Sequence, residues 1–404
     1  MARSPLLPID QAIAAVLTPF APLAAESVAI AEAAGRTLAA DVTAHTSQPP
    51  FAASSMDGYA VRAADTARCP ATLKIIDEIP AGRVSTVTIR PGEAARIFTG
   101  APLPAGADAV VMQENTERQG DTVVIKEGVA VGRFVRPAGL DFTAGQVLVS
   151  AGARLDARHI AVAAAANWPT LPVRRRPRIG ILASGDELVL PGEPCGPGQI
   201  VSSNSLALAA LIEAEGGAAI DFGIARDTVA DLKRAGEAAL AAKLDLLVTS
   251  GGASVGEHDL IQAAFGELGL DLEFWRVAMR PGKPLLYGKF AGLPLLGLPG
   301  NPVSSLVCGY LFLAPVIRRL LGRTPERLPT MPARLGAALP ENDERQEYLR
   351  ARLTEKNGDL VATPFANQDS SMLSPLAAAD AFIIRPPFAP PAAAGDMAAI
   401  IKLS

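Results

Sequence analysis

The sequence contains few of the residues that form disulfides or bind transition metals. Its 404 residues include three cysteines and three histidines. Cys69, Cys195 and Cys308 lie far apart, and neither the cysteines nor the histidines have the spacing of a zinc site. Reduced thiols of this kind are typical of cytoplasmic proteins, so we expect a cytoplasmic location.

Long apolar segments and a strong net charge are also missing. Pro8 and Asp10 interrupt the N-terminal apolar stretch, which argues against a signal peptide. The longest apolar run, residues 306–317, contains Pro315 and is too short to span a bilayer, so we expect a buried helix and no membrane partner. The net charge of −4 gives no general attraction to nucleic acid. The arginines of residues 172–178 lack interleaved aromatics, and we interpret them as a solvated linker.

The composition that is present is globular, and the chain is long enough for several domains. Hydrophobic residues make up 49% of the chain and charged residues 19%. Residues 46–139 hold short β-branched runs that predict an inserted β domain, with strands at 73–76, 86–89, 109–112 and 122–125. Helical spacing flanks this insert, at 10–18, 26–40 and 156–167, and we interpret the first two segments as two helices or as a helix and a helical turn. We therefore expect residues 1–45 and 140–175 to join as one discontinuous connecting subdomain.

Residues 176–327 alternate between strand and helix patterns. Strands are expected at 179–183, 219–224 and 244–248, and helices at 203–215, 229–242 and 260–268. Such alternation predicts a doubly wound, mostly parallel α/β sheet, whose ligands bind beyond the carboxyl ends of the strands. Two apolar runs, 284–287 and 293–298, and a helix at 303–321 follow. Residues 328–404 are predicted to form a C-terminal β-barrel-like module, so the fold class is multidomain α/β plus β.

A glycine-rich turn follows the strand expected at 244–248. Glycines let the backbone approach a ligand closely, and a helix N-terminus beyond the turn offers N–H groups to an anion. A simple tight turn is the alternative interpretation. His258 is expected to be a solvated loop residue, since no catalytic pair stands out. The predicted ligand-binding residues of this turn are Ser250, Gly251, Gly252, Ser254 and Gly256.

Four acids lie near the ends of the predicted sheet strands, and we predict them as metal ligands. Taken singly, each is more simply explained as a helix N-cap. Aimed at one crevice, they would repel each other unless a cation lay among them, which indicates Mg²⁺ on a phosphate-containing ligand. The four are Asp186, Glu187, Asp227 and Asp259.

Two proline-containing turns complete the candidate site. Arg280 and Lys283 flank a rigid Pro-Gly turn, are expected to face the same way, and can clamp an oxyanion, although such clusters usually lie on a solvated surface. A second turn precedes the helix at 303–321, and its first N–H groups and Ser304 can line an anion pocket. A plain helix start with proline explains it equally well. Its residues are Pro299, Gly300, Asn301 and Pro302.

Six motifs, in order along nearly the whole chain, resemble those of the molybdopterin molybdenumtransferase family, the bacterial MoeA proteins and the E domain of gephyrin. They are Ser-Met-Asp-Gly-Tyr-Ala (55–60), Arg-Ile-Phe-Thr-Gly-Ala-Pro-Leu-Pro (96–104), Ser-Gly-Asp-Glu-Leu (184–188), Thr-Ser-Gly-Gly-Ala-Ser-Val-Gly-Glu-His-Asp (249–259), Arg-Pro-Gly-Lys-Pro (280–284) and Leu-Pro-Gly-Asn-Pro-Val-Ser (298–304).

The resemblance implies a transferase that inserts molybdate into adenylylated molybdopterin with Mg²⁺ and releases AMP and molybdenum cofactor. Arg280 stands where family members often have lysine, and Gln-Asp-Ser-Ser (368–371) replaces the more usual Gln-Gly-Ser-Gly. The implied catalytic residues are Asp57, Thr99, Asp141, Glu187, Asp227 and Asp259. The residues implied to hold molybdate are Arg280, Lys283, Ser304, Arg350 and Ser370.

The resemblance also implies partners. It predicts an elongated homodimer whose cleft combines the α/β domain of one subunit with the inserted β domain of the other. Contacts with a molybdopterin adenylyltransferase and with recipient molybdoenzymes are expected too. Two alternatives remain: the adenylylation step itself, because the α/β domain resembles the molybdopterin adenylyltransferases, and a non-catalytic scaffold of the gephyrin type.

Overall fold

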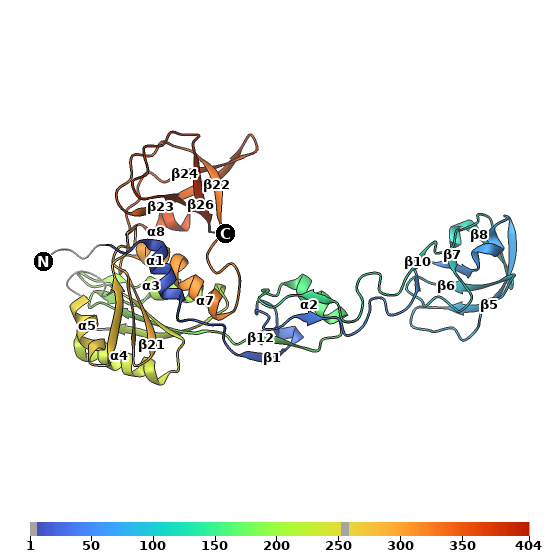
Figure 1. Ribbon diagram of the computed structural model, residues 1–404, viewed down its shortest axis with the longest axis horizontal. Coiled ribbons are helices and arrows are strands. Elements are labelled where there is room, and N and C mark those ends of the chain that lie inside the picture. The colour runs from blue at the N-terminus through green and yellow to red at the C-terminus, as the bar shows by residue number, and fades with distance from the viewer. Residues whose placement is uncertain (1–5, 252–257, 404) are drawn as a thin grey trace.

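The computed structural model describes residues 6–251 and 258–403, except for the side chains of His258 and Asp259. The molecule is elongated (Figure 1). An α/β sheet and a β barrel form one end, a small connecting unit lies in the middle, and the inserted β sheet forms the other end. The domain limits given above stay a prediction.

The α/β sheet has six strands, and its central strands are buried. β13, β16, β17 and β21 run parallel, whereas β20 is antiparallel to both of its neighbours. The prediction of a doubly wound, mostly parallel sheet is therefore confirmed. In spatial order the strands are β16 (Ala218–Ala225), β13 (Arg178–Ser184), β17 (Leu246–Ser250), β21 (Leu293–Leu298), β20 (Leu286–Phe290) and β18 (Leu270–Trp275).

Helices cover both faces of this sheet. Because side chains alternate along a strand, Leu246 and Val248 enter one hydrophobic cluster and Leu247 enters the other. α4 (Val229–Ala241) and α5 (His258–Gly266) cover the Leu247 face. The opposite face is covered by α1 (Ile9–Leu17), α3 (Asn204–Ala214), α6 (Pro302–Cys308) and α7 (Ala314–Leu320). The N-terminal helix thus contributes to the α/β core.

The segment Pro302–Leu320 is one continuous helical stretch in which a π-helical turn, Gly309–Leu313, joins α6 to α7. Its length and composition match those of a membrane-spanning helix, but 78% of its apolar window is buried within the structure. The expectation of a buried helix is confirmed for this stretch.

The connecting unit takes its strands from both flanks of the insert. β1 (Ala25–Ala29) pairs with β12 (Thr170–Arg174), and β2 (Val42–Thr43) pairs with β11 (Val147–Val149). Of the two alternatives for 26–40, the helix is wrong, because pairing with β12 holds its first part as a strand, and the helical turn is the one that fits. Only the short 3-10 turn η1 (Ile30–Glu32) has helical geometry there.

Two further predictions concern this unit: a helix at 156–167 and a linker at 172–178. The helix expected at 156–167 is confirmed as α2 (Ala157–Ala165), and Asp156 caps it by accepting hydrogen bonds from the first-turn N–H groups. The solvated linker predicted at 172–178 is confirmed only in part, since residues 175–177 join β12 to β13 and Arg176 is exposed. The first residues of this segment belong to β12, and Arg175 makes a bidentate ion pair with Asp245, at 2.6 and 2.8 Å.

The insert is a six-stranded sheet attached through one short strand pair, β3 (Ala53–Ser54) with β10 (Val135–Arg136). The strand expected at 86–89 is not formed: within the described chain this segment has no ladder partner, although Ile89 is buried and produced the apolar pattern. In spatial order the strands are β7 (Ala109–Met112), β4 (Gly58–Val61), β6 (Glu93–Ile97), β5 (Ala71–Ile79), β9 (Thr122–Ile125) and β8 (Thr116–Gln119).

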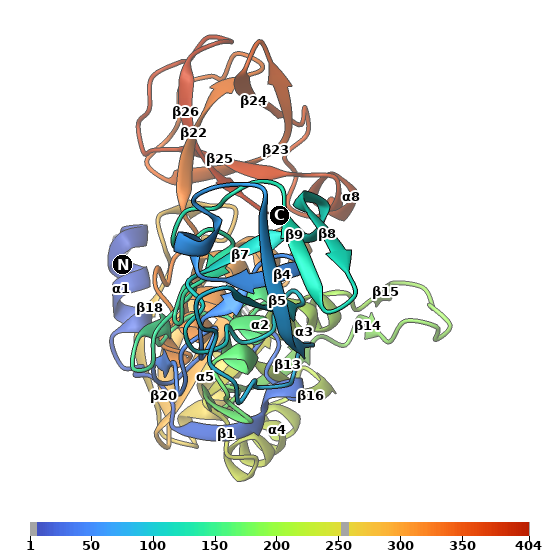
Figure 2. The ribbon, with the colours of Figure 1, turned by 90° about the vertical axis from the view of Figure 1, so that its right-hand side faces the viewer.

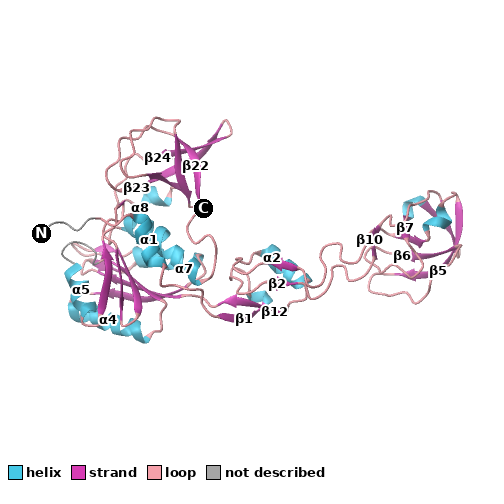
Figure 3. Ribbon diagram, viewed as in Figure 1, coloured by secondary structure: helices cyan, strands magenta, loops and turns pink. Residues whose placement is uncertain are grey.

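The C-terminal strands close into a barrel beside the α/β sheet (Figures 2 and 3). Closure comes from an additional pairing of β23 with β25. β19 (Met279–Arg280), from the α/β part of the chain, pairs parallel with β23 and so attaches the barrel. In spatial order the barrel strands are β23 (Gln346–Lys356), β24 (Asp359–Pro364), β22 (Thr330–Leu335), β26 (Met397–Lys402) and β25 (Ala381–Arg385).

Candidate functional site

A cavity of about 550 Å³ lies at the carboxyl ends of β13, β17 and β21. Its wall combines serine hydroxyls and glycines with apolar side chains, and Ser184, Ser202 and Ser250 are buried. Such a lining offers donors and close backbone approach to a polar ligand. The lining includes Ser184, Glu187, Ser202, Asn204, Ser250, Gly251, Pro299, Gly300, Asn301, Pro302 and Ser371. Two motifs predicted separately from the sequence, the glycine turn and the Pro-Gly-Asn-Pro turn, therefore meet here.

Gly251 is at this point because no other residue fits. Its φ of +96° lies in the left-handed region, and a Cβ on it would stand 2.4 Å from the carbonyl oxygen of Ser184. The Ser184 hydroxyl beside it is buried and has no hydrogen-bond partner among the described residues. Gly252, Ser254 and Gly256, the other predicted residues of this turn, lie outside the described residues.

A second cavity, of about 670 Å³, lies on the other side of the turn that follows β13. Asp186, Arg226 and Thr228 are among its lining residues. The Asp186 N–H donates to the Asp227 carboxylate, and the Asp227 N–H donates to the Asp186 carboxylate, both at 3.3 Å. The two acids that follow β13 and β16 are thus brought together, as expected from parallel strand ends.

The helix-cap explanation fails for Asp227. The cap of α4 is Thr228, whose hydroxyl oxygen accepts the N–H of Asp231 at 3.1 Å. Asp227 is therefore free of capping and lies against Asp186 instead.

The side chains of the other two predicted metal ligands, Glu187 and Asp259, are not shown in contact with Asp186 and Asp227. Glu187 lines the first cavity, whereas Asp186 lines the second. His258, expected in a loop, is the first residue of α5, and Asp259 follows it, but their side chains lie outside the described residues. Within the described chain, no group of three His, Cys, Asp or Glu side chains is close enough to hold a metal ion. The predicted set of four metal ligands stays a prediction.

The turn at 299–302 is attached to the barrel. Asn301 Nδ2 donates to the Ser370 hydroxyl oxygen at 2.9 Å, and the Val303 N–H donates to the Ser370 carbonyl at 3.1 Å. The first N–H of α6 is therefore occupied, and Pro302 has none, which corrects the expectation that these N–H groups line an anion pocket. Ser304 is buried on α6. Ser370 precedes Ser371, which lines the first cavity, and its implied role in holding molybdate stays a prediction.

Arg280 and Lys283 differ in their environments. Arg280 pairs with the barrel carboxylates Glu347, at 2.7 Å, and Asp343, at 3.3 Å. Its charge is largely compensated. Lys283 is exposed, and within the described chain its ammonium group makes no ion pair. Since Pro284 lines the first cavity, Lys283 is the uncompensated cation next to that wall.

Arg350 supports the loop that carries Ser370. It is 1% exposed, and its guanidinium donates to the carbonyls of Asn367, Asp369 and Met372 and to the Gln368 side chain. With Arg280 it lines a third cavity, of about 290 Å³. The guanidinium nitrogens of Arg350 donate hydrogen bonds to this loop. Direct contact of Arg350 with molybdate stays a prediction.

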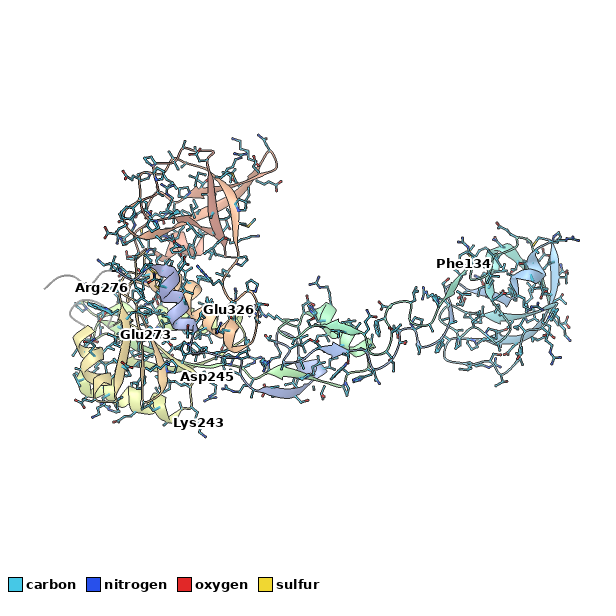
Figure 4. The ribbon with its side chains drawn as sticks, viewed as in Figure 1. Phe134, Lys243, Asp245, Glu273, Arg276 and Glu326 are labelled. Atoms are coloured by element: carbon cyan, nitrogen blue, oxygen red, sulfur yellow. The ribbon has the colours of Figure 1, made fainter. Side chains whose placement is uncertain are left out.

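Asp57 and Thr99 lie close together, but on the insert. Ser55, two residues before Asp57, donates its N–H to the Phe134 carbonyl at 2.9 Å, and Figure 4 shows Phe134 at the far end of the molecule from Arg276. Asp141 is exposed on the chain between the insert and the connecting unit, where its N–H donates to the Gln48 carbonyl. Within one chain, these three residues do not meet the acids of the α/β sheet.

Sequence reasoning missed several polar residues of the first cavity wall, among them Ser184 and Asn204. Asn204 begins α3, and its Nδ2 donates to the Ser250 hydroxyl and to the Gly300 carbonyl, both at 2.8 Å. A signal was present in both cases. Ser184 ends a predicted strand, and Asn204 lies at the start of a predicted helix, so both belong to the sheet edge where ligands bind.

Three family models match consecutive parts of the chain: the MoeA N-terminal region (domain I and II) over 7–167, a probable molybdopterin binding domain over 180–319, and the MoeA C-terminal region (domain IV) over 332–403. The molybdopterin molybdenumtransferase of Bacillus subtilis is 37% identical over 394 residues, which are 95% of this chain and 91% of that protein. The chain belongs to the molybdopterin molybdenumtransferase family.

Other family members agree with this assignment. The molybdopterin molybdenumtransferase of a Nostoc strain is 43% identical over 304 residues, covering 74% of this chain and 70% of that protein. Among solved structures, the molybdopterin biosynthesis MoeA protein of Pyrococcus horikosii matches with a TM-score of 0.86 and 32% identity, over 99% of this chain and 100% of that one. The family resemblance of the motifs and the fold class are confirmed.

Proposed function

We propose that this protein is a molybdopterin molybdenumtransferase that inserts molybdate into adenylylated molybdopterin, in the presence of Mg²⁺, and releases AMP and molybdenum cofactor. One structural observation carries the proposal. The turn that follows β13 separates a hydroxyl-lined cavity from a paired set of acids. A substrate with a pterin phosphate at one end and an adenylyl group at the other needs both kinds of surface.

Asp186 and Asp227 suit Mg²⁺ bound together with a substrate phosphate. Mg²⁺ is usually held by about one or two carboxylates, with phosphate oxygens and waters completing its shell. Each carboxylate accepts the backbone N–H of the other aspartate, and Asp186 lines a cavity rather than the core. The metal would neutralise charge on the phosphoanhydride, while the two aspartates hold it. Glu187 and Asp259 belong to the same proposed set.

Molybdate is a tetrahedral dianion and needs donors and positive charge. We assign the principal charge to Lys283, since Arg280 is already paired with Glu347 and Asp343. Asn301, Ser304 and Ser370 supply polar groups from α6 and the barrel loop that Arg350 supports. This set places the dianion where the α/β sheet, α6 and the barrel meet.

The remaining catalytic residues come from a second copy of the chain in this proposal. Asp57 and Thr99 lie on the insert, at the opposite end of the molecule from the α/β sheet (Figure 1). A homodimer that places one insert over the partner's sheet edge would bring Asp57, Thr99 and Asp141 to the cleft. We further propose a cytoplasmic location and contacts with a molybdopterin adenylyltransferase and with recipient molybdoenzymes.

Purified protein incubated with adenylylated molybdopterin, molybdate and Mg²⁺ tests the proposal. AMP release should require molybdate and Mg²⁺, and the product should activate an apo-molybdoenzyme. Absence of both outcomes refutes the function. Consumption of ATP with molybdopterin, independent of molybdate, would instead identify the adenylylation step. A stoichiometric protein partner retained by an inactive Asp57→Ala variant would indicate a scaffold.

A further inference from the structure

The side chain of Asn204 bridges the two turns that form the floor of the first cavity. Its Nδ2 lies 2.8 Å from the Ser250 hydroxyl oxygen, at the end of β17, and 2.8 Å from the Gly300 carbonyl oxygen, after β21. Asn204 itself belongs to α3 and lines the same cavity. One amide group thus connects a helix to two strand ends.

The orientation of this amide is determined by its partners. A carbonyl oxygen accepts hydrogen bonds and cannot donate them, so the atom next to the Gly300 carbonyl must be the NH₂ group. Both N–H bonds of Nδ2 are then used, one toward each turn. The bridge therefore depends on a donor that neither an aliphatic side chain nor a carboxylate can provide.

The two turns need such a bridge because glycines form them. A Cβ on Gly251 would collide with Ser184, and a Cβ on Gly300 would stand 3.6 Å from the Gly251 Cα, so the two backbones are in close contact. Without side chains, this contact has little interlocking surface to fix its spacing. The hydrogen bonds that Asn204 donates on one side, and those that Asn301 and Val303 donate to Ser370 on the other, set that spacing.

We propose that Asn204 is a positioning residue for adenylylated molybdopterin: it holds the Ser250–Gly251 and Pro299–Pro302 turns at the separation that the anionic substrate requires. The proposal rests on the function proposed above. Asn204 acts through the turns, so its loss reduces the use of this substrate while the rest of the fold and the molybdate residues stay intact.

Two substitutions in the full-length protein test this role. Asn204→Ala removes the bridge, and Asn204→Leu removes it while filling a similar volume. Both should lower kcat/KM for adenylylated molybdopterin about tenfold, the ratio that corresponds to about 1.4 kcal/mol and is typical of a lost hydrogen bond. The KM for molybdate should stay unchanged. Ser205→Ala is the matched control, since Ser205 lies next in α3 and its hydroxyl has no partner among the described residues.

Hydrogen exchange provides a readout that does not depend on activity. In both Asn204 variants, amides of residues 246–251 and 298–304 should lose protection, whereas those of β13 should keep it. Recovery of wild-type kinetics by Asn204→Leu would show that packing matters and would overturn the proposal. An equal loss of protection in β13 would do the same, because it would indicate a general structural role.

The exchange experiment also separates failure of this inference from failure of the proposed function. If the wild-type protein releases no AMP, the function is refuted while loosened turns in Asn204→Ala still support the bridge. If the wild-type protein is active and the turns keep their protection in Asn204→Ala, the bridge is refuted alone.

Discussion

Asp57 accepts two hydrogen bonds from a single residue: the Thr99 N–H and the Thr99 hydroxyl both lie 2.8 Å from its Oδ1. The backbone hydrogen bond is the larger cause, the hydroxyl the next, and together they lower the pKa of this exposed carboxyl below its ordinary value. Thr99 therefore keeps Asp57 charged and oriented on the insert.

Replacing Thr99 by valine should move the acidic limb of the activity profile. Thr99→Val keeps the N–H and removes the hydroxyl, so the pKa of Asp57 rises toward its ordinary value. A lowered pKa keeps the carboxylate charged until the pH falls through it, and hence the variant loses activity at a higher pH than wild type. We also expect a fall of roughly tenfold in kcat from poorer orientation. AMP release measured against pH checks this, with Thr122→Val as a control on the same sheet.

Mixed dimers should recover activity that neither parent has. If Asp57 and Asp227 of one cleft come from different subunits, then coexpressed Asp57→Ala and Asp227→Ala chains form hybrids with one intact cleft. Random pairing predicts about a quarter of wild-type activity, since about half of the dimers carry one good site in two. Differently tagged chains allow the hybrids to be isolated. An inactive hybrid would place both residues in one subunit's cleft and contradict the shared site.

Lys283 should govern the affinity for molybdate more than Arg280 does. Lys283→Ala removes an uncompensated cation, so we expect KM for molybdate to rise about tenfold, with a smaller effect at high salt. Lys243→Ala is the charge-matched control, because Lys243 is exposed and lies away from the barrel side of the sheet (Figure 4). Kinetics at two ionic strengths make the comparison. Equal changes in the two variants would point to net charge rather than to a binding contact.

Glu215 should matter for stability and not for chemistry. It accepts from the guanidinium groups of Arg318, at 2.5 and 2.8 Å, and of Arg323, at 3.0 Å, and about a tenth of its side chain is exposed. Glu215→Gln leaves two partly buried cations facing each other, at a cost of roughly 3 kcal/mol in the free energy of unfolding. Denaturant titration measures this loss.

The exposed pair of Glu78 with Arg118 provides the comparison for that measurement. Glu78→Gln should change the free energy of unfolding by less than about 1 kcal/mol, as is usual for solvated ion pairs. If Glu215→Gln proves equally mild, the Glu215 cluster contributes no more than a surface pair.

Much of the α/β sheet was predictable because its signals are local. The longer strands and helices between Arg178 and Ala241 carry their own apolar runs, and Asp156 marks the start of α2 in the sequence. The strand β1 was mistaken for a helix because its state is decided by β12, which is distant in sequence. Apolar spacing alone does not reveal such a partner.

The candidate site was also predictable from the sequence only in part. Parallel strands end at one edge, so the sequence alone was enough to place Asp186 beside Asp227. Which side of the turn each acid faces was not predictable, and Asp186 and Glu187 face different cavities. The same holds for Arg350, whose burial depends on a loop that closes around it in three dimensions.

The insert enters and leaves the molecule through a single strand pair, with Ser54 opposite Val135. Chain ends that lie side by side can be joined by a short connection without stretching what remains. The insert is thus one continuous segment of the chain that can be removed or replaced as a unit. It can be exchanged or deleted without severing the path of the remaining chain, so the part of the protein that we propose reaches toward a second subunit can vary independently of the part that holds the cavity.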